Sequence, residues 1–231
     1  MAPTRRTAIV IGALYLITHV TSVAGLALYG PVLTSADYGA YLASPGAANR
    51  ALLGGFLEVL LTLSIVGTGV AFYRVVKVFN EGMALGYAAL RTLEAGIIAV
   101  GVAPLMAAVT LAQRSGDENA ALIQMLASLH NWTFLIGPSF ACGANTVVLA
   151  VLLLRSRLVA RFIPVLGLVG GPLVFASGIA QMFGVFPQAS PIAALAAIPV
   201  FAWEISLALH LVIRGFRHAP QPAAAVRPAI V

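Results

Sequence analysis

A long apolar segment with an ionic pair near its middle restricts this chain more than any other feature. It runs from Gly82 to Leu111 and carries Arg91 and Glu94. About thirty helical residues rise about 45 Å, more than the ~30 Å hydrocarbon layer of a bilayer, so the segment predicts one tilted membrane span. Residues three positions apart lie on the same side of a helix, and charged groups at bilayer depth need partners. The rest of the chain must therefore supply polar groups at that depth.

The composition is that of an integral membrane protein. Hydrophobic residues make up 61% of the 231 residues and charged residues only 9%, with a mean hydropathy of +1.00. A soluble domain of this size does not keep such values. The net charge of +6 comes from short basic clusters between apolar runs, which is typical of a membrane-orientation signal rather than of a nucleic-acid-binding surface. The single cysteine, Cys142, excludes an internal disulfide and a multi-cysteine metal site.

Five further apolar runs complete a predicted all-α bundle of six transmembrane helices that covers residues 7–218. A short basic N-terminus, residues 1–6, precedes it. The Pro- and Ala-rich tail, residues 219–231, has too little to bury and is expected to be disordered. Pro138 and Pro172 are expected to kink or break the helices that contain them. The spans are predicted at about 7–29, 51–73, 82–111, 128–154, 162–184 and 192–213.

The longest predicted connection, residues 30–50, joins the first two spans. Pro31 is expected to end the first helix, and Tyr29 is expected to anchor it at the membrane interface. Ser35 is predicted to cap a short helix through Leu42 that lies on the membrane surface.

The basic residues predict the orientation of the bundle. If the N-terminus lies in the cytoplasm, ten basic residues face the cytoplasm, whereas only Arg50 and Arg114 face the other side. This bias predicts that both termini are cytoplasmic, in a multi-pass protein of the bacterial inner (cytoplasmic) membrane. The ten residues are Arg5, Arg6, Arg74, Lys77, Arg155, Arg157, Arg161, Arg214, Arg217 and Arg227.

Polar groups of four predicted helices lie at one depth. We obtain the depth by counting residues from the basic end of each span at about 1.5 Å per residue, which places these groups near the bilayer midplane. We expect them to line an internal polar pocket, in which Arg91 pairs with Glu94 or Glu204. The groups at this depth are His19, Arg91, Glu94, Asn145 and Glu204.

Other positions add weaker signals. Tyr15 and His19 belong to a polar stripe with helical spacing that should face the bundle. Glu58 lies shallower, nearer the surface opposite the termini, and His130 falls roughly on the Asn145 face of the fourth helix. Two glycine pairs with small-xxx-small spacing predict close helix packing. These pairs are Gly82 with Gly86 and Gly167 with Gly171.

The charge count suggests a function. Glu58, Glu94 and Glu204 share one arginine, so at least one carboxyl group lacks a basic partner. Such a group can exchange protons or bind a cation, and it can equally fasten two helices as a neutral acid. The sequence favours a non-enzymatic protein, such as a transporter, that binds or passes a small polar or cationic ligand. Two alternatives stay open: a structural or regulatory membrane subunit, and an intramembrane enzyme that uses His130 or His19 with Glu204.

Sequence motifs for other chemistry are missing. The chain contains no His-Glu-x-x-His helix, no phosphate-binding glycine loop and no G-x-S-x-G elbow. We therefore predict no catalytic residue, no metal ligand, no cofactor and no nucleic-acid partner. The expected partners are the lipid bilayer and a small polar or cationic ligand, and association with further copies of the chain stays open. The candidate ligand-binding or proton-exchange residues are Arg91, Glu94, Glu204, His19, Glu58, His130, Asn145 and Tyr15.

Several short motifs support a resemblance to a known family. They are Tyr15 in the first span, Arg91-Thr92-Leu93-Glu94-Ala95, Leu129-His130 followed by Phe134-Leu135-Ile136-Gly137, Arg161-Phe162-Ile163-Pro164-Val165-Leu166-Gly167, and Trp203-Glu204-Ile205-Ser206-Leu207-Ala208-Leu209. From Arg6 to Gly215 the chain resembles a bacterial family of six-span membrane proteins classed as domain of unknown function 4386. The resemblance implies six helices and no assigned activity. The chain departs from the family pattern after His130, where Asn131-Trp132 replaces a glycine and an aromatic residue.

Overall fold

The computed structural model describes residues 4–34, 41–42, 44, 46–115 and 119–217. Six helices of this part are long and apolar enough to cross a membrane, which confirms the predicted all-α fold class. The C-terminal tail and nearly all of the predicted surface helix at 35–42 lie outside the described residues. The elements are α1 (Arg5–Thr34), α3 (Ala47–Val76), α4 (Glu81–Ser115), α5 (Ala120–Leu135), η2 (Ile136–Ala141), α6 (Cys142–Ser156), α7 (Phe162–Met182) and α8 (Pro191–Ile213).

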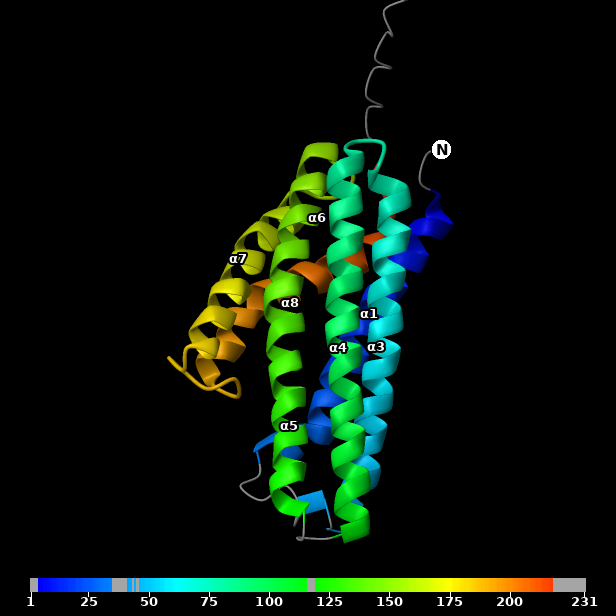
Figure 1. Cartoon of the computed structure of the whole chain (residues 1–231). Coiled ribbons are helices and arrows are strands. Elements are labelled where there is room, and N and C mark those ends of the chain that lie inside the picture. Colours follow the sequence, from blue (N-terminus) through cyan, green and yellow to red (C-terminus); the bar gives the residue numbers. More distant parts are fainter. Residues whose placement is uncertain (1–3, 35–40, 43, 45, 116–118, 218–231) are drawn as a thin grey trace, which may run out of the picture.

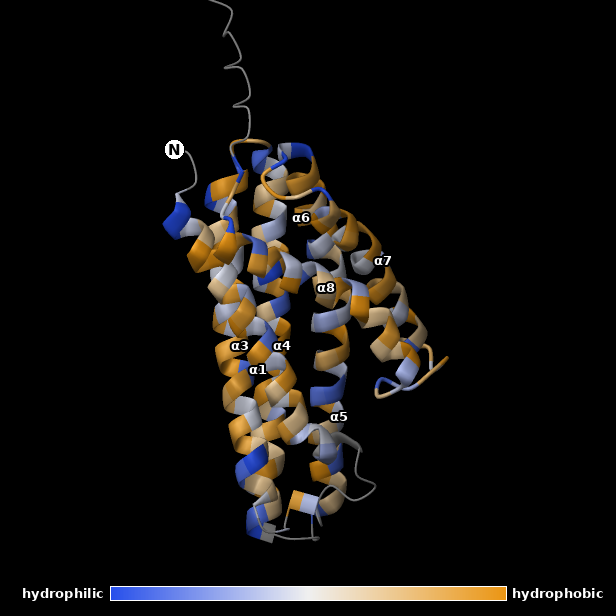
Figure 2. Cartoon of the chain, turned by 180° about the vertical axis from the view of Figure 1, so that it is seen from behind, coloured by the Kyte–Doolittle hydropathy of each residue, from blue (hydrophilic) through white to orange (hydrophobic). Residues whose placement is uncertain are grey.

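The helices form a bundle that closes where α8 packs on α1. Helix α4 packs against α3, α5 and α6, so its buried polar residues have neighbours on several sides. In Figure 1, α3, α4 and the α5–α6 helix run roughly alongside one another, while α7 and α8 lean against one part of their length. Figure 2 shows hydrophobic outer faces between more hydrophilic ends, as expected of a bundle surrounded by lipid.

Buried apolar residues form separate clusters along the bundle. The largest cluster includes Ile11, Phe72 and Trp203 and lies toward the end at which α1 begins and α8 ends. A second cluster, which includes Leu105 and Ile123, lies toward the other end. Between these two clusters lie the polar side chains that the sequence places at one depth, from His19 to Glu204. Charged groups therefore interrupt the apolar core near its middle.

The fourth span is one continuous helix with a widened turn in its middle. Residues 136–141 form the π-helix η2, which contains Pro138 and joins α5 to α6. A proline lacks the N–H group that a regular helix needs and its ring clashes with the carbonyl four residues earlier, so a π-turn accommodates it. The distortion expected at Pro138 therefore takes this form. Because a π-turn holds more residues than an α-turn, it also changes which faces of α5 and α6 align.

Two prolines do not end or break their helices as predicted. Helix α1 continues through Pro31 to Thr34, and α7 runs through Pro172 without interruption. A broken helix would expose backbone N–H and C=O groups to lipid, where water cannot satisfy them. Losing one hydrogen bond at a proline is therefore less costly than ending the helix.

The end of α8 is capped by its own chain and by α1. Gly215 has a φ of 75°, a left-handed conformation that favours glycine, and its N–H donates to the carbonyls of His210 and Leu211. From α1, Arg5 donates from Nη1 to Leu211 O at 2.9 Å and from Nη2 to Val212 O and Ile213 O. The start of α1 and the end of α8 therefore lie at the same end of the bundle.

The contact between Arg5 and α8 predicts a stability effect. Arg5→Ala removes charge-assisted hydrogen bonds to carbonyls of the last turn of α8 and should lower the free energy of unfolding by about 1 kcal/mol. Arg6→Ala is the matched control, because Arg6 is exposed at the neighbouring position. Reversible unfolding in detergent micelles measures both variants, and equal stability of the two would contradict the capping role.

Candidate functional site

The structure brings together the five side chains that the sequence places at one depth. At their centre Arg91 of α4 is 2% exposed, and its guanidinium Cζ lies 5.3 Å from the centre of the Tyr15 ring. Its Nη1 donates to Glu94 Oε2 at 3.0 Å, and its Nε donates to Thr68 Oγ1 of α3 at 3.0 Å. The same Nη1 lies 3.6 Å from Glu204 Oε1 of α8. Arg91 therefore links α3, α4 and α8 in the middle of the bundle.

Glu94 is the better paired of the two carboxylates. Its Oε2 accepts from Arg91 and also from Asn145 Nδ2 of α6 at 2.7 Å. Asn145 is held in turn, because its Nδ2 donates to Ala141 O at 2.8 Å. Two donors on one oxygen of a buried carboxylate stabilise its ionised form and fix its position. Glu94 thus fastens α4 to α6.

Glu204 is held more loosely. Its side chain is 14% exposed, against 6% for Glu94, and neither of its ionic contacts reaches hydrogen-bond length. One contact is the 3.6 Å approach to Arg91, and the other joins Glu204 Oε2 to His19 Nε2 at 3.7 Å. His19 Nδ1 lies 3.0 Å from Tyr15 O, and a carbonyl only accepts, so Nδ1 carries the hydrogen and Nε2 of a neutral ring is bare. A proton on Nε2 would let His19 donate to Glu204.

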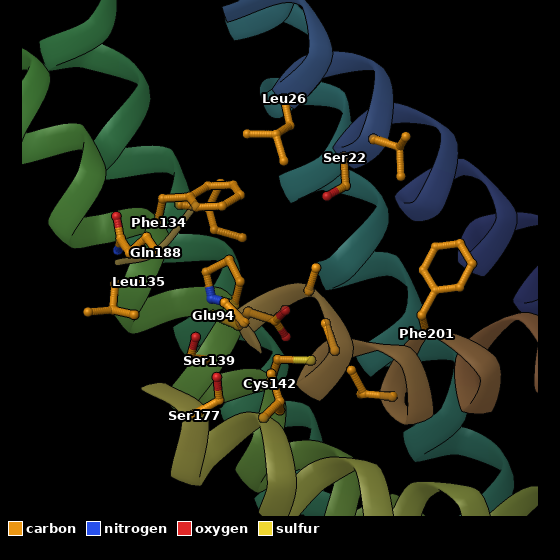
Figure 3. A pocket seen from close by; sticks show the side chains of 18 of the residues that line it. Ser22, Leu26, Glu94, Phe134, Leu135, Ser139, Cys142, Ser177, Gln188 and Phe201 are labelled. Carbon is orange, nitrogen blue, oxygen red and sulfur yellow. The ribbon is translucent and has the colours of Figure 1, made fainter. Parts of the chain in front are cut away.

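A cavity of about 660 Å³ begins at these charges. It is lined by Arg91, Glu94, Glu204 and His19 and by mostly apolar side chains of α1, α3 and α5 to α8. In Figure 3, Ser22 and Leu26 of α1 lie across the opening from Phe134 and Leu135 of α5. The lining also includes residues 188–190 of the α7–α8 connection, so the cavity extends from the charged residues toward the end opposite the termini.

The connection between α7 and α8 is tied to α5 beside this cavity. Gln188 Nε2 donates to Asn131 O at 3.1 Å. Gln188 lines the cavity and also a smaller neighbouring pocket of about 240 Å³ that contains Asn131 and Trp132. This hydrogen bond therefore holds the α7–α8 connection against α5 at the wall of the cavity.

Glu58 and His130 lie apart from the Arg91 network. Neither lines the cavity; instead His130 Nε2 lies 3.8 Å from Glu58 Oε1, and Tyr29 OH donates to that same oxygen at 2.7 Å. The prediction that Tyr29 is an interfacial anchor is wrong, since the side chain is 1% exposed and makes this buried contact. His130 and Asn145 do not share a site because they lie about fifteen residues apart along the fourth span, with η2 between them.

Sequence reasoning missed three contributors to these two clusters. Tyr87 OH lies 2.8 Å from Tyr15 OH and is four residues before Arg91, so the i, i+4 spacing could have identified it. Thr68 and Tyr29 carry no such signal, because their partners come from other helices. Among the described residues, no group of three His, Cys, Asp or Glu side chains is placed to hold a metal ion.

Comparison with known proteins gives one match. Residues 10–215 match the family described as "Domain of unknown function (DUF4386)". No curated protein and no solved structure matches the chain. The match covers all six spans, from within α1 to just beyond the end of α8.

Proposed function

The chain belongs to the DUF4386 family, a domain of unknown function, and from its geometry we propose that it binds and passes a small organic cation in the cavity beside Glu204, in exchange for a proton. The observation that carries the proposal is the unequal pairing of Glu94 and Glu204 around one arginine. We place the protein in the bacterial inner membrane, with the cavity facing away from the cytoplasm, because the basic residues predict cytoplasmic termini.

The charges around the cavity favour a positive ligand. Arg91 makes its hydrogen bonds with Glu94 and Thr68, and it approaches Glu204 only to 3.6 Å, beyond hydrogen-bond length. With His19 neutral, one arginine and two glutamates leave a net charge of about −1 at bilayer depth. A buried charge without a close partner is unfavourable, so either a proton or a cation is expected to occupy the Glu204 side of the cavity.

The shape and lining favour a cation with an apolar body. A volume of about 660 Å³ lies within the roughly 300–1,000 Å³ that is typical of small-molecule sites. Apart from the charged end, the walls are mainly aliphatic and aromatic, and the rings of Phe134 and Phe201 lie on different walls. Aromatic rings with a nearby carboxylate are the groups that recognise a quaternary ammonium.

Binding to a matched pair of ligands tests this proposal. Benzyltrimethylammonium and neopentylbenzene have nearly the same shape, but only the first carries a charge. Titration calorimetry on the protein in nanodiscs, with empty nanodiscs subtracted, should show binding of the cation and at least tenfold weaker binding of the neutral compound. Glu204→Gln should weaken cation binding at least about tenfold, because a partner of a desolvated charge is lost.

Glu81→Gln is the control for this experiment, since Glu81 is an exposed glutamate in the first turn of α4 and does not line the cavity. A pH-sensitive dye outside liposomes should report release of a proton as the cation binds to the wild-type protein. Equal binding of the two ligands, or full binding by the Glu204→Gln protein, would reject the proposal and favour a structural or regulatory subunit.

A further inference from the structure

A second buried polar cluster lies outside the cavity, and we infer that it is a proton-binding site in which Glu58 and His130 share one proton. The cluster consists of Tyr29 of α1, Glu58 of α3 and His130 of α5, with the Gly101 carbonyl of α4 beside it. Each of the three side chains is 1% exposed. Four successive helices thus contribute to one buried polar cluster.

Two polar atoms of this cluster have no hydrogen-bond partner within the described part of the chain. They are Glu58 Oε2 and His130 Nε2. A buried polar group without a partner is costly, more so when it carries charge. Both atoms belong to ionisable groups that approach each other, with His130 Nε2 3.8 Å from Glu58 Oε1, so one proton held between the two groups would lower this cost.

The contacts of His130 define where that hydrogen can be. His130 Nδ1 lies 2.9 Å from Gly101 O, and since a carbonyl only accepts, Nδ1 is a donor. Nε2 of the neutral ring is then a bare acceptor that faces the carboxyl group. If Glu58 were ionised at the same time, two acceptors would face each other around a buried negative charge.

One proton removes this conflict in either of two positions. On Glu58 it makes a carboxylic acid that faces Nε2, and on Nε2 it makes an imidazolium that faces the carboxylate, with 3.8 Å between the two atoms. The proton comes from bulk water and returns to it, so only one O–H or N–H bond forms or breaks. In both forms the pair is neutral overall, which its burial favours.

Among the described residues, no other charged side chain forms an ion pair with Glu58 or His130. From α1 the cluster is faced by Tyr29, whose OH donates to Glu58 Oε1, and from α4 by the Gly101 carbonyl. The basic residue nearest along α3 is Arg50, which is exposed and lies about two helical turns from Glu58. The ion pairs of Arg91 go to Glu94 and Glu204 instead.

Phe134 connects this site to the cavity. Its ring stacks on His130 with centroids 6.2 Å apart and an interplanar angle of 25°, and the same side chain lines the cavity. Tyr29 lies edge-on to His130 at 5.0 Å and to Phe134 at 6.5 Å. A movement of the His130 ring when the proton leaves therefore acts on the cavity wall. This coupling, unlike the proton site itself, rests on the proposed function.

Spectroscopy on the full chain in nanodiscs, without any added cation, tests the proton site. Infrared spectra report a protonated carboxyl group, and nitrogen NMR of labelled histidine reports whether Nε2 of His130 is bare, hydrogen-bonded or protonated. At neutral pH we expect one proton on the pair: either a carboxylic acid band that Glu58→Gln removes, or an imidazolium signal assigned to His130. In alkaline solution the signal should be lost. Glu81→Gln should leave the spectra unchanged.

A carboxylate at Glu58 together with a bare Nε2 at His130 at neutral pH would overturn the inference. This outcome does not depend on whether the Glu58→Gln protein folds, because the NMR spectrum of the wild-type protein shows the protonation state of the His130 ring. The His130→Gln variant serves to assign the His130 signal. The measurement is also independent of Glu204, so failure of cation binding and failure of the proton site are distinguished.

Discussion

Arg91→Met is expected to lower the free energy of unfolding by about 3–5 kcal/mol, because it leaves the buried Glu94 and the partly buried Glu204 without the arginine that pairs with them. Methionine keeps much of the side-chain length and removes the charge and the donors. Reversible unfolding in detergent micelles measures the loss. Arg114→Met on the same helix is the control, since Arg114 is exposed, and it should change stability by less than about 0.5 kcal/mol.

A second variant shows whether Arg91→Met destabilises the protein through unpaired charges or through lost side-chain packing. Arg91→Met combined with Glu94→Gln and Glu204→Gln removes the whole ionic group, so its stability should recover above that of Arg91→Met alone. The recovery should appear as non-additivity when the variants are compared in a mutant cycle. If the combined variant is no more stable than Arg91→Met, the cost lies in side-chain packing and the ionic argument is wrong.

Gly170→Ala should give the second large effect. A Cβ atom at Gly170 would lie 2.5 Å from Val200 N and 2.8 Å from Pro199 C, both backbone atoms of α8. Backbone atoms cannot turn aside as a flexible side chain can, so α7 and α8 must separate, at about 1–3 kcal/mol. Because α8 carries Glu204, the separation of α7 and α8 should also weaken the binding of benzyltrimethylammonium.

Gly86→Ala is the matched control for this substitution. A Cβ atom at Gly86 meets nothing within 4 Å, so the change should be neutral or slightly stabilising. Thermal unfolding of the two variants in the same detergent compares them directly. A Gly170→Ala protein as stable as the Gly86→Ala protein would show that α7 and α8 are not held in close contact.

The glycine pairs illustrate the limits of a spacing rule. A Cβ atom at Gly171 would lie 2.8 Å from the carbonyl oxygen of Gly143, and a Cβ atom at Gly167 would lie 2.8 Å from the ring of Trp203. The predicted close packing of this pair is therefore confirmed. The prediction for Gly82 and Gly86 is wrong, because no neighbouring helix approaches them. Spacing places two small residues on one face of a helix, but it does not tell whether another helix packs there.

The sequence by itself determined the six long apolar helices and the position of each charged residue along them. Both are local properties: apolar length decides whether a helix spans the bilayer, and a constant rise per residue converts position into depth. The contact between Arg91 and Glu94 is local as well, since three residues separate them.

Only the tertiary structure decided which side chains at a given depth meet. The looser pairing of Glu204, the contact of His130 with Glu58 and the burial of Tyr29 depend on how helices rotate and tilt against one another. The π-turn at Pro138 changes those rotations within a single span. Lateral neighbours arise from packing between distant segments, and for that reason the cavity and both polar clusters became visible only in the assembled bundle.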